Sequence, residues 1–371
     1  MKSLALGEKK HYQLPDLAGF FSYKHKMSFF YNFMNSKIAP SILVVLLSSI
    51  PLLISNKPTT VSSPFKPAPI GNKFSFLSVK SSETKKAETK PVPPKAATPP
   101  CAPNVINLTT PWLEQCPNLY MSFSSLKDGP INTKIFNIYN GPPEGNQEAQ
   151  LYTNNQRNIA IENGTLTLRA LDNPSNNFRY TSARIDTKDK KDFFYGRLEI
   201  EATLPNNIGA WPAIWMLATN RKYIGMSSSS DPLRYLNDGE IDIAESVGAE
   251  PNVVYGIAHS LAHPPGESND YFNVAVVPNN DIQFHKYGID WTPNKLSFTL
   301  DGVEYFAIDK QPGADYKSWP YDQPFYLIIN LAVGGAWGGI LRSQYPPDGV
   351  NTSQLPFVMK VRTISYYRMK S

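Results

Sequence analysis

The sequence has few of the residues that bind metal ions. Only two cysteines and five histidines occur among its 371 residues, and they form no group with neighbouring acidic residues at the spacings that hold a metal ion. The sequence therefore predicts no metal site, and we expect no other cofactor. The cysteines, Cys101 and Cys116, could form a disulfide in an exported protein, and two buried free thiols are the alternative.

Arginine is absent from the first hundred residues, which contain 14 lysines and only 4 acidic residues. The rest of the chain contains 22 basic and 27 acidic residues, so the net charge of +5 arises in the N-terminal region. A folded part with an acidic balance lacks the positive surface that nucleic acids require. We therefore expect no nucleic-acid partner.

An apolar segment, 38–56, without a single charge, belongs to the basic N-terminal region 1–55. Lysines precede it, and its length is close to what a bilayer requires. The segment predicts export, with the folded part of the protein outside the cytoplasm. No clear small-x-small cleavage site follows it, so a cleaved signal of a secreted protein and a retained transmembrane anchor both stay open.

Residues 56–100 contain nine prolines among lysines, serines and threonines. Such a composition cannot form a hydrophobic core and favours an extended chain. We interpret this segment as a linker that precedes a folded domain at 101–371.

Helical periodicity is scarce in residues 101–371, and no internal repeat is found. Alternation is common instead: in YGRLEIEATLP, every second residue from Leu198 to Leu204 is apolar. Asp301-Gly302 lies between two alternating runs and predicts a hairpin, and FYLIINLAV predicts a strand that is buried on both faces. We therefore expect one all-β domain, an antiparallel sandwich. If one of its sheets is concave, the outer face forms a groove for a long polymer.

The segment GEIDIAESVG carries three acidic residues in an apolar, β-prone run. On a regular strand Glu240 and Asp242 share a face, whereas Glu245 points the opposite way. A β-bulge at Ile243–Ala244 would return Glu245 to the face of Glu240. Grouped carboxylates of this kind are typical of glycosidic bond hydrolysis, in which one attacks and another donates a proton. Unrelated acids on an exposed strand are the alternative.

The surrounding segments resemble glycoside hydrolase family 16, in its endo-β-1,3-glucanase (laminarinase) branch. The resemblance lies in the six residues Glu240 to Glu245, in GAWPAIWMLATN upstream, and in VYGIAHS, HKYGIDWTPNKLSFTLDGVEYF and PFYLIINLAVGGAWGG downstream. It covers approximately residues 130–370. It implies a β-jelly roll with a substrate groove on its concave sheet, and endo-acting hydrolysis of β-1,3-glucan through a covalent glycosyl-enzyme with retention of configuration.

By the same resemblance, Glu240 is the nucleophile, Glu245 is the general acid/base and Asp242 assists them. Trp211 and Trp215 would line the groove, with Trp211 as the platform on which a sugar ring stacks. For Trp215 a place in the core is an equal alternative.

Four further residues are expected to bind substrate. His259 would sit beside the acid/base. Arg184 and Asn330 would contact sugar hydroxyls. Trp337 would cap the donor side of the groove. The alternative is that Trp337 only fills space in a glycine-rich loop.

The family also has a structural calcium site on the convex face, to which an Asp of the last strand contributes. In this chain Arg362 falls at that position. A cation is unfavourable there, so the resemblance does not extend to calcium, and a salt bridge of Arg362 is expected to replace the charge of the ion.

Several alternatives to the glucanase stay open at this stage. Relatives with the same motif act on mixed-linkage glucan or algal galactan, and a transglycosylase would pass the sugar to another sugar instead of water. The segments 222–238 and 263–272 are expected to set this choice. A glucan-binding protein without activity and a structural envelope protein are the rivals from other classes. The domain is expected to act as a monomer.

Overall fold

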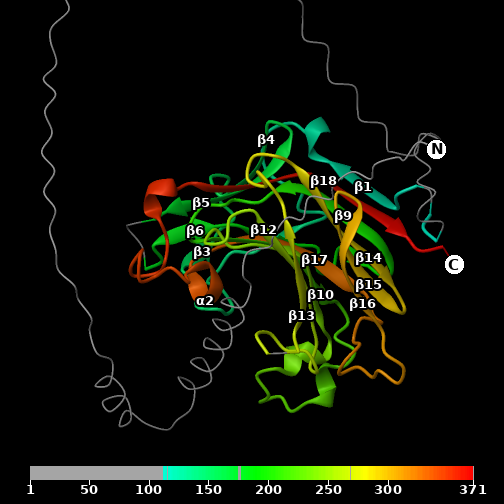
Figure 1. Cartoon of the computed structure of the whole chain (residues 1–371). Helices are drawn as coiled ribbons and strands as arrows, with labels where there is room; N and C mark the ends of the chain where they lie inside the picture. Colours follow the sequence, from blue (N-terminus) through cyan, green and yellow to red (C-terminus); the bar gives the residue numbers. More distant parts are fainter. Residues whose placement is uncertain (1–111, 115, 174–176, 268, 371) are drawn as a thin grey trace, which may run out of the picture. The chain divides into compact units, whose positions relative to one another are not determined.

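The structure is a computed structural model, and it describes residues 112–114, 116–173, 177–267 and 269–370 (Figure 1). The expected N-terminal region, its apolar segment and the linker all lie outside the described residues, and so does Cys101. Cys116 is disulfide-bonded, and its pairing with Cys101 stays a prediction. Among the described residues, no helix has the length and apolarity needed to cross a membrane.

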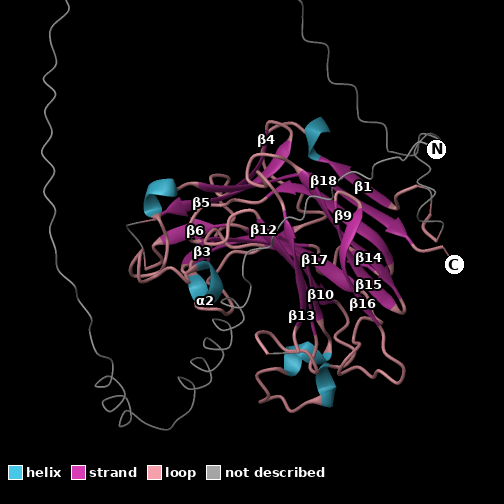
Figure 2. Ribbon diagram, in the orientation of Figure 1, coloured by secondary structure: helices cyan, strands magenta, loops and turns pink. Residues whose placement is uncertain are grey.

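Two β-sheets form the described domain, as the magenta strands in Figure 2 show. The larger sheet has ten strands in the order β16-β15-β14-β9-β18-β5-β6-β3, with β1 paired to β18 and β4 paired to β5. Its strands are β1 (Leu119–Ser122), β3 (Gln150–Tyr152), β4 (Ile159–Glu162), β5 (Thr165–Asp172), β6 (Tyr180–Ser182), β9 (Gly196–Thr203), β14 (His285–Thr292), β15 (Lys295–Leu300), β16 (Val303–Asp309) and β18 (Phe357–Arg368).

The smaller sheet has eight strands in the order β13-β12-β11-β10-β17-β7-β2, with β8 paired to β17. Its strands are β2 (Asn137–Ile138), β7 (Arg184–Asp186), β8 (Asp192–Phe193), β10 (Ala210–Ala218), β11 (Glu240–Glu245), β12 (Val253–His259), β13 (Tyr271–Val276) and β17 (Phe325–Val333). Neighbouring strands run antiparallel in both sheets except β3 and β6, which are parallel. The predicted antiparallel sandwich is therefore confirmed.

Helical structure is confined to short turns within the described residues. One α-helical turn, α2 (Gly335–Gly338), follows β17. The remaining turns are of the 3₁₀ type: η1 (Phe123–Ser125), η2 (Ile224–Met226), η3 (Arg234–Asn237) and η4 (Thr352–Gln354). Two of them, η2 and η3, lie in the connection between β10 and β11, which includes the expected substrate-selecting segment 222–238.

The hydrophobic core lies between the two sheets and is built from alternate residues of the strands. Leu198, Ile200 and Ala202 of β9 are all buried in it, as the alternation predicts. The strand β17 is buried along its whole length, as its continuous apolar sequence predicts. Asp301 and Gly302 have φ values of 50° and 81°, as a two-residue hairpin between β15 and β16 requires.

Arg362 interrupts the pairing of β18 with β9. Val361 pairs with Ala202 and Thr363 pairs with Glu201, so Arg362 is an extra residue at a bulge. Its guanidinium forms an ion pair with Glu201 at 2.7 Å. The expected salt bridge of Arg362 is confirmed, and a position held by a guanidinium does not suit a calcium ion.

Candidate active site

The bulge predicted in β11 is present in its pairing with β10. Consecutive β10 residues, Ile214 and Trp215, pair with Ala244 and Asp242. Ile243 therefore has no partner on β10, and β11 carries one residue more than its neighbour across this stretch.

The pairing with β12, on the other side of β11, shows the same extra residue. Asp242 pairs with Ile257 and Glu245 pairs with Tyr255. Three steps along β11 thus correspond to two along β12, which changes the parity of the alternation at Ile243–Ala244. The bulge prediction is confirmed from both flanking strands.

The bulge turns two consecutive residues of β11 toward the core. Ile241, Ile243 and Ala244 all belong to the core between the sheets. Because Ala244 already points inward, Glu245 points to the opposite face, which it shares with Glu240. All three acidic residues therefore lie on the face of the sheet that points away from the core, as expected.

Burial controls the ionisation of this acidic group. Burial, together with the negative charges of Glu240 and Glu245, holds the pKa of Asp242 well above its usual value. Burial also raises the pKa of Glu240, and it does so against the opposing effects of His259, a hydrogen bond with Asp242, and Arg184. Two adjacent carboxyl groups that both resist ionisation are suited to share one proton.

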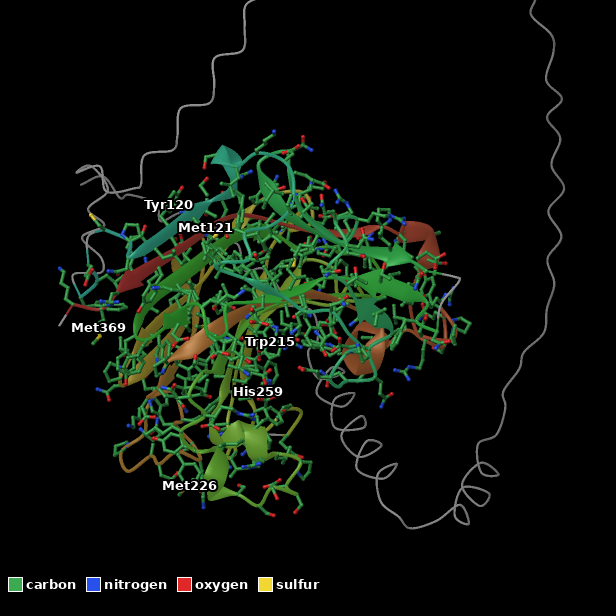
Figure 3. All side chains as sticks on the ribbon, turned by 180° about the vertical axis from the view of Figure 1, so that it is seen from behind. Tyr120, Met121, Trp215, Met226, His259 and Met369 are labelled. Carbon is green, nitrogen blue, oxygen red and sulfur yellow. The ribbon has the colours of Figure 1, made fainter. Side chains whose placement is uncertain are left out.

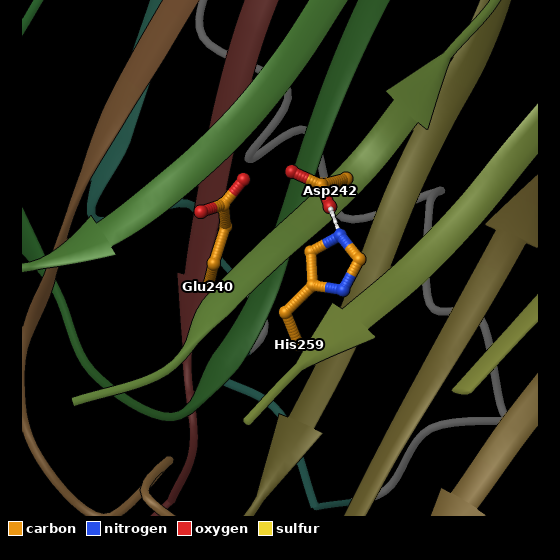
Figure 4. Close-up of side chains that lie close together, drawn as sticks. All are labelled: Glu240, Asp242 and His259. Carbon is orange, nitrogen blue, oxygen red and sulfur yellow. Dashed lines mark ion pairs between the residues drawn. The ribbon is translucent and has the colours of Figure 1, made fainter. Parts of the chain in front are cut away.

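The imidazole of His259 lies against these acids (Figure 4). His259 pairs with Glu240 across the strands, and its Nε2 atom lies 3.3 Å from Oδ2 of Asp242. Glu245 pairs with Tyr255 instead. His259 thus lies directly beside the predicted nucleophile and the assisting aspartate, and the charge of Glu245 also acts on it. Its expected place beside the acid/base stays a prediction.

Glu245 is held by the indole of Trp211. The Nε1 atom of Trp211 donates a 2.6 Å hydrogen bond to Oε1 of Glu245. Trp211 is only 8% exposed, and Trp337 packs edge-on against its ring at 5.8 Å. Trp337 also packs edge-on against Tyr255. A sugar ring has little room to stack on Trp211, so the expected platform role gives way to that of holding Glu245.

Trp215 lies on the same face and is more exposed than Trp211. Figure 3 labels it together with His259, on the two strands that flank β11. The Trp215 indole donates a 2.7 Å hydrogen bond to Oδ1 of Asn330, and the Arg184 guanidinium lies 5.3 Å from its ring centre. The alternative of a core position for Trp215 is wrong, and of the two tryptophans it offers the larger surface.

Asn330 and Arg184 are already engaged by neighbouring side chains. The amide nitrogen of Asn330 donates to the Tyr152 hydroxyl at 3.2 Å, while its oxygen accepts from Trp215. Arg184 forms an ion pair with Glu144 at 3.1 Å. Their contacts with sugar hydroxyls, and the place of Trp337 on the donor side, stay predictions.

A cavity of about 400 Å³ lies beside this group, on the same face of the sheet. Arg184 of β7, Leu217 of β10 and Tyr326 of β17 contribute to it, and these residues alternate with core residues in the same sense as Trp215 and Asn330. Gly239, which directly precedes Glu240, also lines it. The remaining lining residues are Tyr139, Glu144, Asp186, Lys188, Ala218, Arg221, Tyr235 and Asp238. The cavity is a polar recess with tyrosines on its walls, adjacent to Glu240.

Ligand atoms of Glu240, Asp242 and His259 lie within 4.8 Å of one another, which is close enough to approach a metal ion. Carboxylate-based glycoside hydrolysis uses such acids for nucleophilic and proton-transfer steps and requires no metal. The proximity of these three residues therefore does not by itself indicate a metal site.

Asp270 and Tyr152 also contact residues of the site, although no motif in the sequence indicates them. Asp270 contacts His259 from the segment after β12, and Tyr152 reaches Asn330 from the other sheet. Nothing in their local sequence separates them from other loop or strand residues, because their contacts arise from segments far apart in the chain.

Comparisons with known proteins agree with this geometry. Residues 146–342 match the family model of glycosyl hydrolases family 16. The chain belongs to this family. A beta-glucanase of Rhodothermus marinus is 39% identical over 229 residues, which cover 60% of this chain and 75% of that protein. The glucan endo-1,3-beta-glucosidase A1 of Niallia circulans is 32% identical over 240 residues, 60% of this chain but 33% of that protein.

Among solved structures, the laminarinase from Rhodothermus marinus matches with a TM-score of 0.62 and 35% identity, and the match covers 70% of this chain and 98% of that one. The predicted membership of family 16 and the jelly-roll fold are thereby confirmed. As a family 16 member the chain is a glycoside hydrolase, and its reaction requires no cofactor.

The hydrogen bond between Trp211 and Glu245 provides a test of the site. Replacing Trp211 by Phe removes a bond to an ionisable carboxyl group, which contributes about 1.5–3 kcal/mol. We expect kcat to fall by roughly tenfold to a hundredfold, because the indole N–H no longer helps to orient the Glu245 carboxyl group. Trp291→Phe is the matched control, since it removes the indole donor of an equally buried tryptophan in the other sheet. Equal kcat values for both variants would contradict the assigned role of Trp211.

Proposed function

We propose that this protein is an endo-acting, retaining hydrolase of β-1,3-glucan, in which Glu240 is the nucleophile and Glu245 the general acid/base. The observation that carries the proposal is the bulge in β11, which brings Glu240, Asp242 and Glu245 to one face beside a recess. A strand without the bulge would direct Glu245 into the core, where it could not reach a substrate.

The reaction proceeds in two balanced steps. In the first, a carboxylate oxygen of Glu240 attacks the anomeric carbon while the bond to the leaving oxygen breaks, and Glu245 gives its proton to that oxygen. In the second, Glu245 takes a proton from water, whose oxygen attacks the same carbon and releases Glu240 as a carboxylate. Two inversions at one carbon give overall retention.

The electrostatics of the site support these roles. A nucleophile must be ionised at the start of the reaction, and burial alone would work against this for Glu240. His259 and Arg184 both lower its pKa, while Asp242, whose own pKa is well above its usual value, can supply a hydrogen bond to it. Asp242 thus assists by remaining protonated beside the nucleophile.

The substrate class comes from the relatives and from the adjacent recess. Relatives from Rhodothermus marinus and Niallia circulans carry the names laminarinase and glucan endo-1,3-beta-glucosidase. The recess next to Glu240 combines tyrosine side chains with polar groups, as sugar sites do. We place the donor sugars there, and we assign Trp215 as the aromatic surface beside the bond that is cleaved.

Parallel digestion of laminarin, mixed-linkage glucan and agarose by the purified protein tests the substrate. We expect oligosaccharides of several lengths from laminarin at early times, which an endo-acting enzyme produces, and at least tenfold slower release from agarose. Products longer than the starting oligosaccharide would indicate transglycosylation. Tight binding of laminarin without any cleavage would contradict hydrolysis and favour the glucan-binding alternative.

We also propose that the enzyme is exported and acts as a monomer on polysaccharide outside the cytoplasm. The charge-free segment 38–56 and the proline-rich segment 56–100 support this proposal. Fractionation of the producing cells tests it: enzyme in the medium indicates a cleaved signal, and enzyme in the membrane fraction indicates an anchor. Recovery with the cytoplasmic proteins would contradict export.

A further inference from the structure

A second buried carboxylate lies behind the acids of β11. The side chain of Asp270, directly before β13, is only 3% exposed. Its Oδ2 atom accepts a hydrogen bond from the backbone N–H of Gly266 at 3.1 Å. Its Oδ1 atom has no hydrogen bond of good geometry but lies 3.2 Å from Nδ1 of His259. A carboxylate that is this deeply buried is costly unless a charge compensates it.

His259 therefore lies between two aspartates. Its Nδ1 faces Asp270 at 3.2 Å, and its Nε2 faces Asp242 at 3.3 Å. A neutral imidazole carries a proton on only one nitrogen, and its other nitrogen would have to accept the proton of Asp242, which the proposed mechanism directs to Glu240. Only the imidazolium presents an N–H to both residues. The backbone of His259 is held as well, because the Tyr321 hydroxyl donates to the His259 carbonyl at 2.9 Å.

We propose that Asp270 is a positioning residue for catalysis, which holds His259 as an imidazolium against Asp242. This proposal rests on the glucanase function proposed above and deepens it. Through His259, Asp270 places one positive charge next to the two acids that must share a proton. The segment 263–272 thereby connects the rim of the site, where substrate choice is expected to lie, to the ionisation of the nucleophile.

The charges around His259 determine how the reaction depends on pH. Glu240, Asp242 and Glu245 of β11 face it from one side and Asp270 from the other, while Tyr321 contacts its backbone. Burial lowers the pKa of His259, but Asp270 and then the β11 acids raise it above its usual value. A group with a raised pKa keeps its proton at low pH and loses it as the pH rises. Loss of the Asp270 charge moves this deprotonation to lower pH, and activity should then fail first on the alkaline side.

Asp270→Asn in the full chain tests the proposal. Asparagine keeps an oxygen for the Gly266 N–H and removes only the charge. We expect kcat on laminarin to fall about tenfold at pH 6 and about tenfold further at pH 8, relative to the parent, with KM changed by less than about twofold. Asp281→Asn is the matched control, because it makes the same replacement at an exposed aspartate outside the two segments expected to set substrate choice, and it should match the parent at both pH values.

NMR of the histidine ring nitrogens provides a second test that does not depend on folding of the variant. In the parent at pH 7 we expect His259, identified by the loss of its signal in His259→Gln, to carry protons on both nitrogens. A neutral His259 in the parent, or a folded Asp270→Asn variant with the parental kcat and pH profile, would overturn the proposal. Inactivity of the parent on every glucan and galactan would instead refute the proposed function, and the NMR result would still decide the state of His259.

Discussion

Replacing Glu240 by Gln is expected to lower kcat on laminarin by roughly 10⁴-fold or more while laminarin binding persists. An amide is nearly isosteric with a carboxylate but cannot form the covalent bond to the anomeric carbon, so the first step of the reaction is lost. Exchanging the half-buried Glu240 carboxyl group for an amide should leave the fold intact, because Glu240 lies on the face opposite the core. Binding is measured by calorimetry with a laminarin oligosaccharide, and turnover by release of reducing sugar.

The matched control for this variant is Glu304→Gln, which changes an exposed residue of β16 in the other sheet. It should hydrolyse laminarin at the parental rate. A Glu240→Gln variant that retains more than about one hundredth of the parental kcat would show that another residue is the nucleophile. A variant that loses both turnover and binding, yet unfolds at the parental temperature, would assign Glu240 to binding alone.

Replacing Glu245 by Ala should have an effect that depends on the leaving group. On laminarin, whose leaving sugar oxygen needs a proton, we expect a loss of about 10³-fold or more. An aryl β-glucoside whose leaving group is a very acidic phenol needs no such proton, because the phenolate departs unaided. The first step on this substrate should therefore remain close to the parental rate. The glycosyl-enzyme then accumulates, since no base activates water in the second step.

Azide should restore turnover of the Glu245→Ala variant, because this anion needs no general base and enters the space left by the carboxylate. A retaining mechanism predicts that the product is the β-glycosyl azide. The α-glycosyl azide, or equal losses on laminarin and on the aryl substrate, would contradict the role of Glu245 as acid/base.

The features that follow from local alternation could be predicted from the sequence. The period of two in β9 and the Asp301-Gly302 pair determine which residues enter the core and where a hairpin forms, and both agree with the structure. The bulge could also be predicted, because three acids cannot be placed in a core without partners. A spacing of two and then three therefore requires one extra residue in β11.

The features that depend on the pairing of distant strands could not be predicted. The pairing of His259 with Glu240 follows from the register of β12 against the bulged β11, which the sequence alone does not determine. Trp211 was expected to be open to a sugar ring, and the glycine-rich turn α2 brings Trp337 over it. Neither the register of β12 nor the packing of Trp337 on Trp211 can be predicted from the local sequence around His259 or Trp211.

The same reason explains why Asp270 could not be predicted from the sequence. It lies in a loop whose sequence predicts only a turn-rich connection between β12 and β13. Its significance arises from the 3.2 Å approach to His259, a residue eleven positions earlier in the chain. By contrast, Arg362 could be interpreted in advance, because a positive charge in the place of a calcium ligand requires an acidic partner wherever the chain folds.

The most direct test of the account is to trap the covalent intermediate. A 2-deoxy-2-fluoro laminaribioside with a good leaving group slows both steps and allows the glycosyl-enzyme to accumulate, and mass spectrometry of the peptic peptides then locates the sugar. The account predicts one sugar per protein molecule, attached to Glu240 in the β11 peptide. Attachment to another residue, or turnover of the reagent by direct inversion without any adduct, would contradict it.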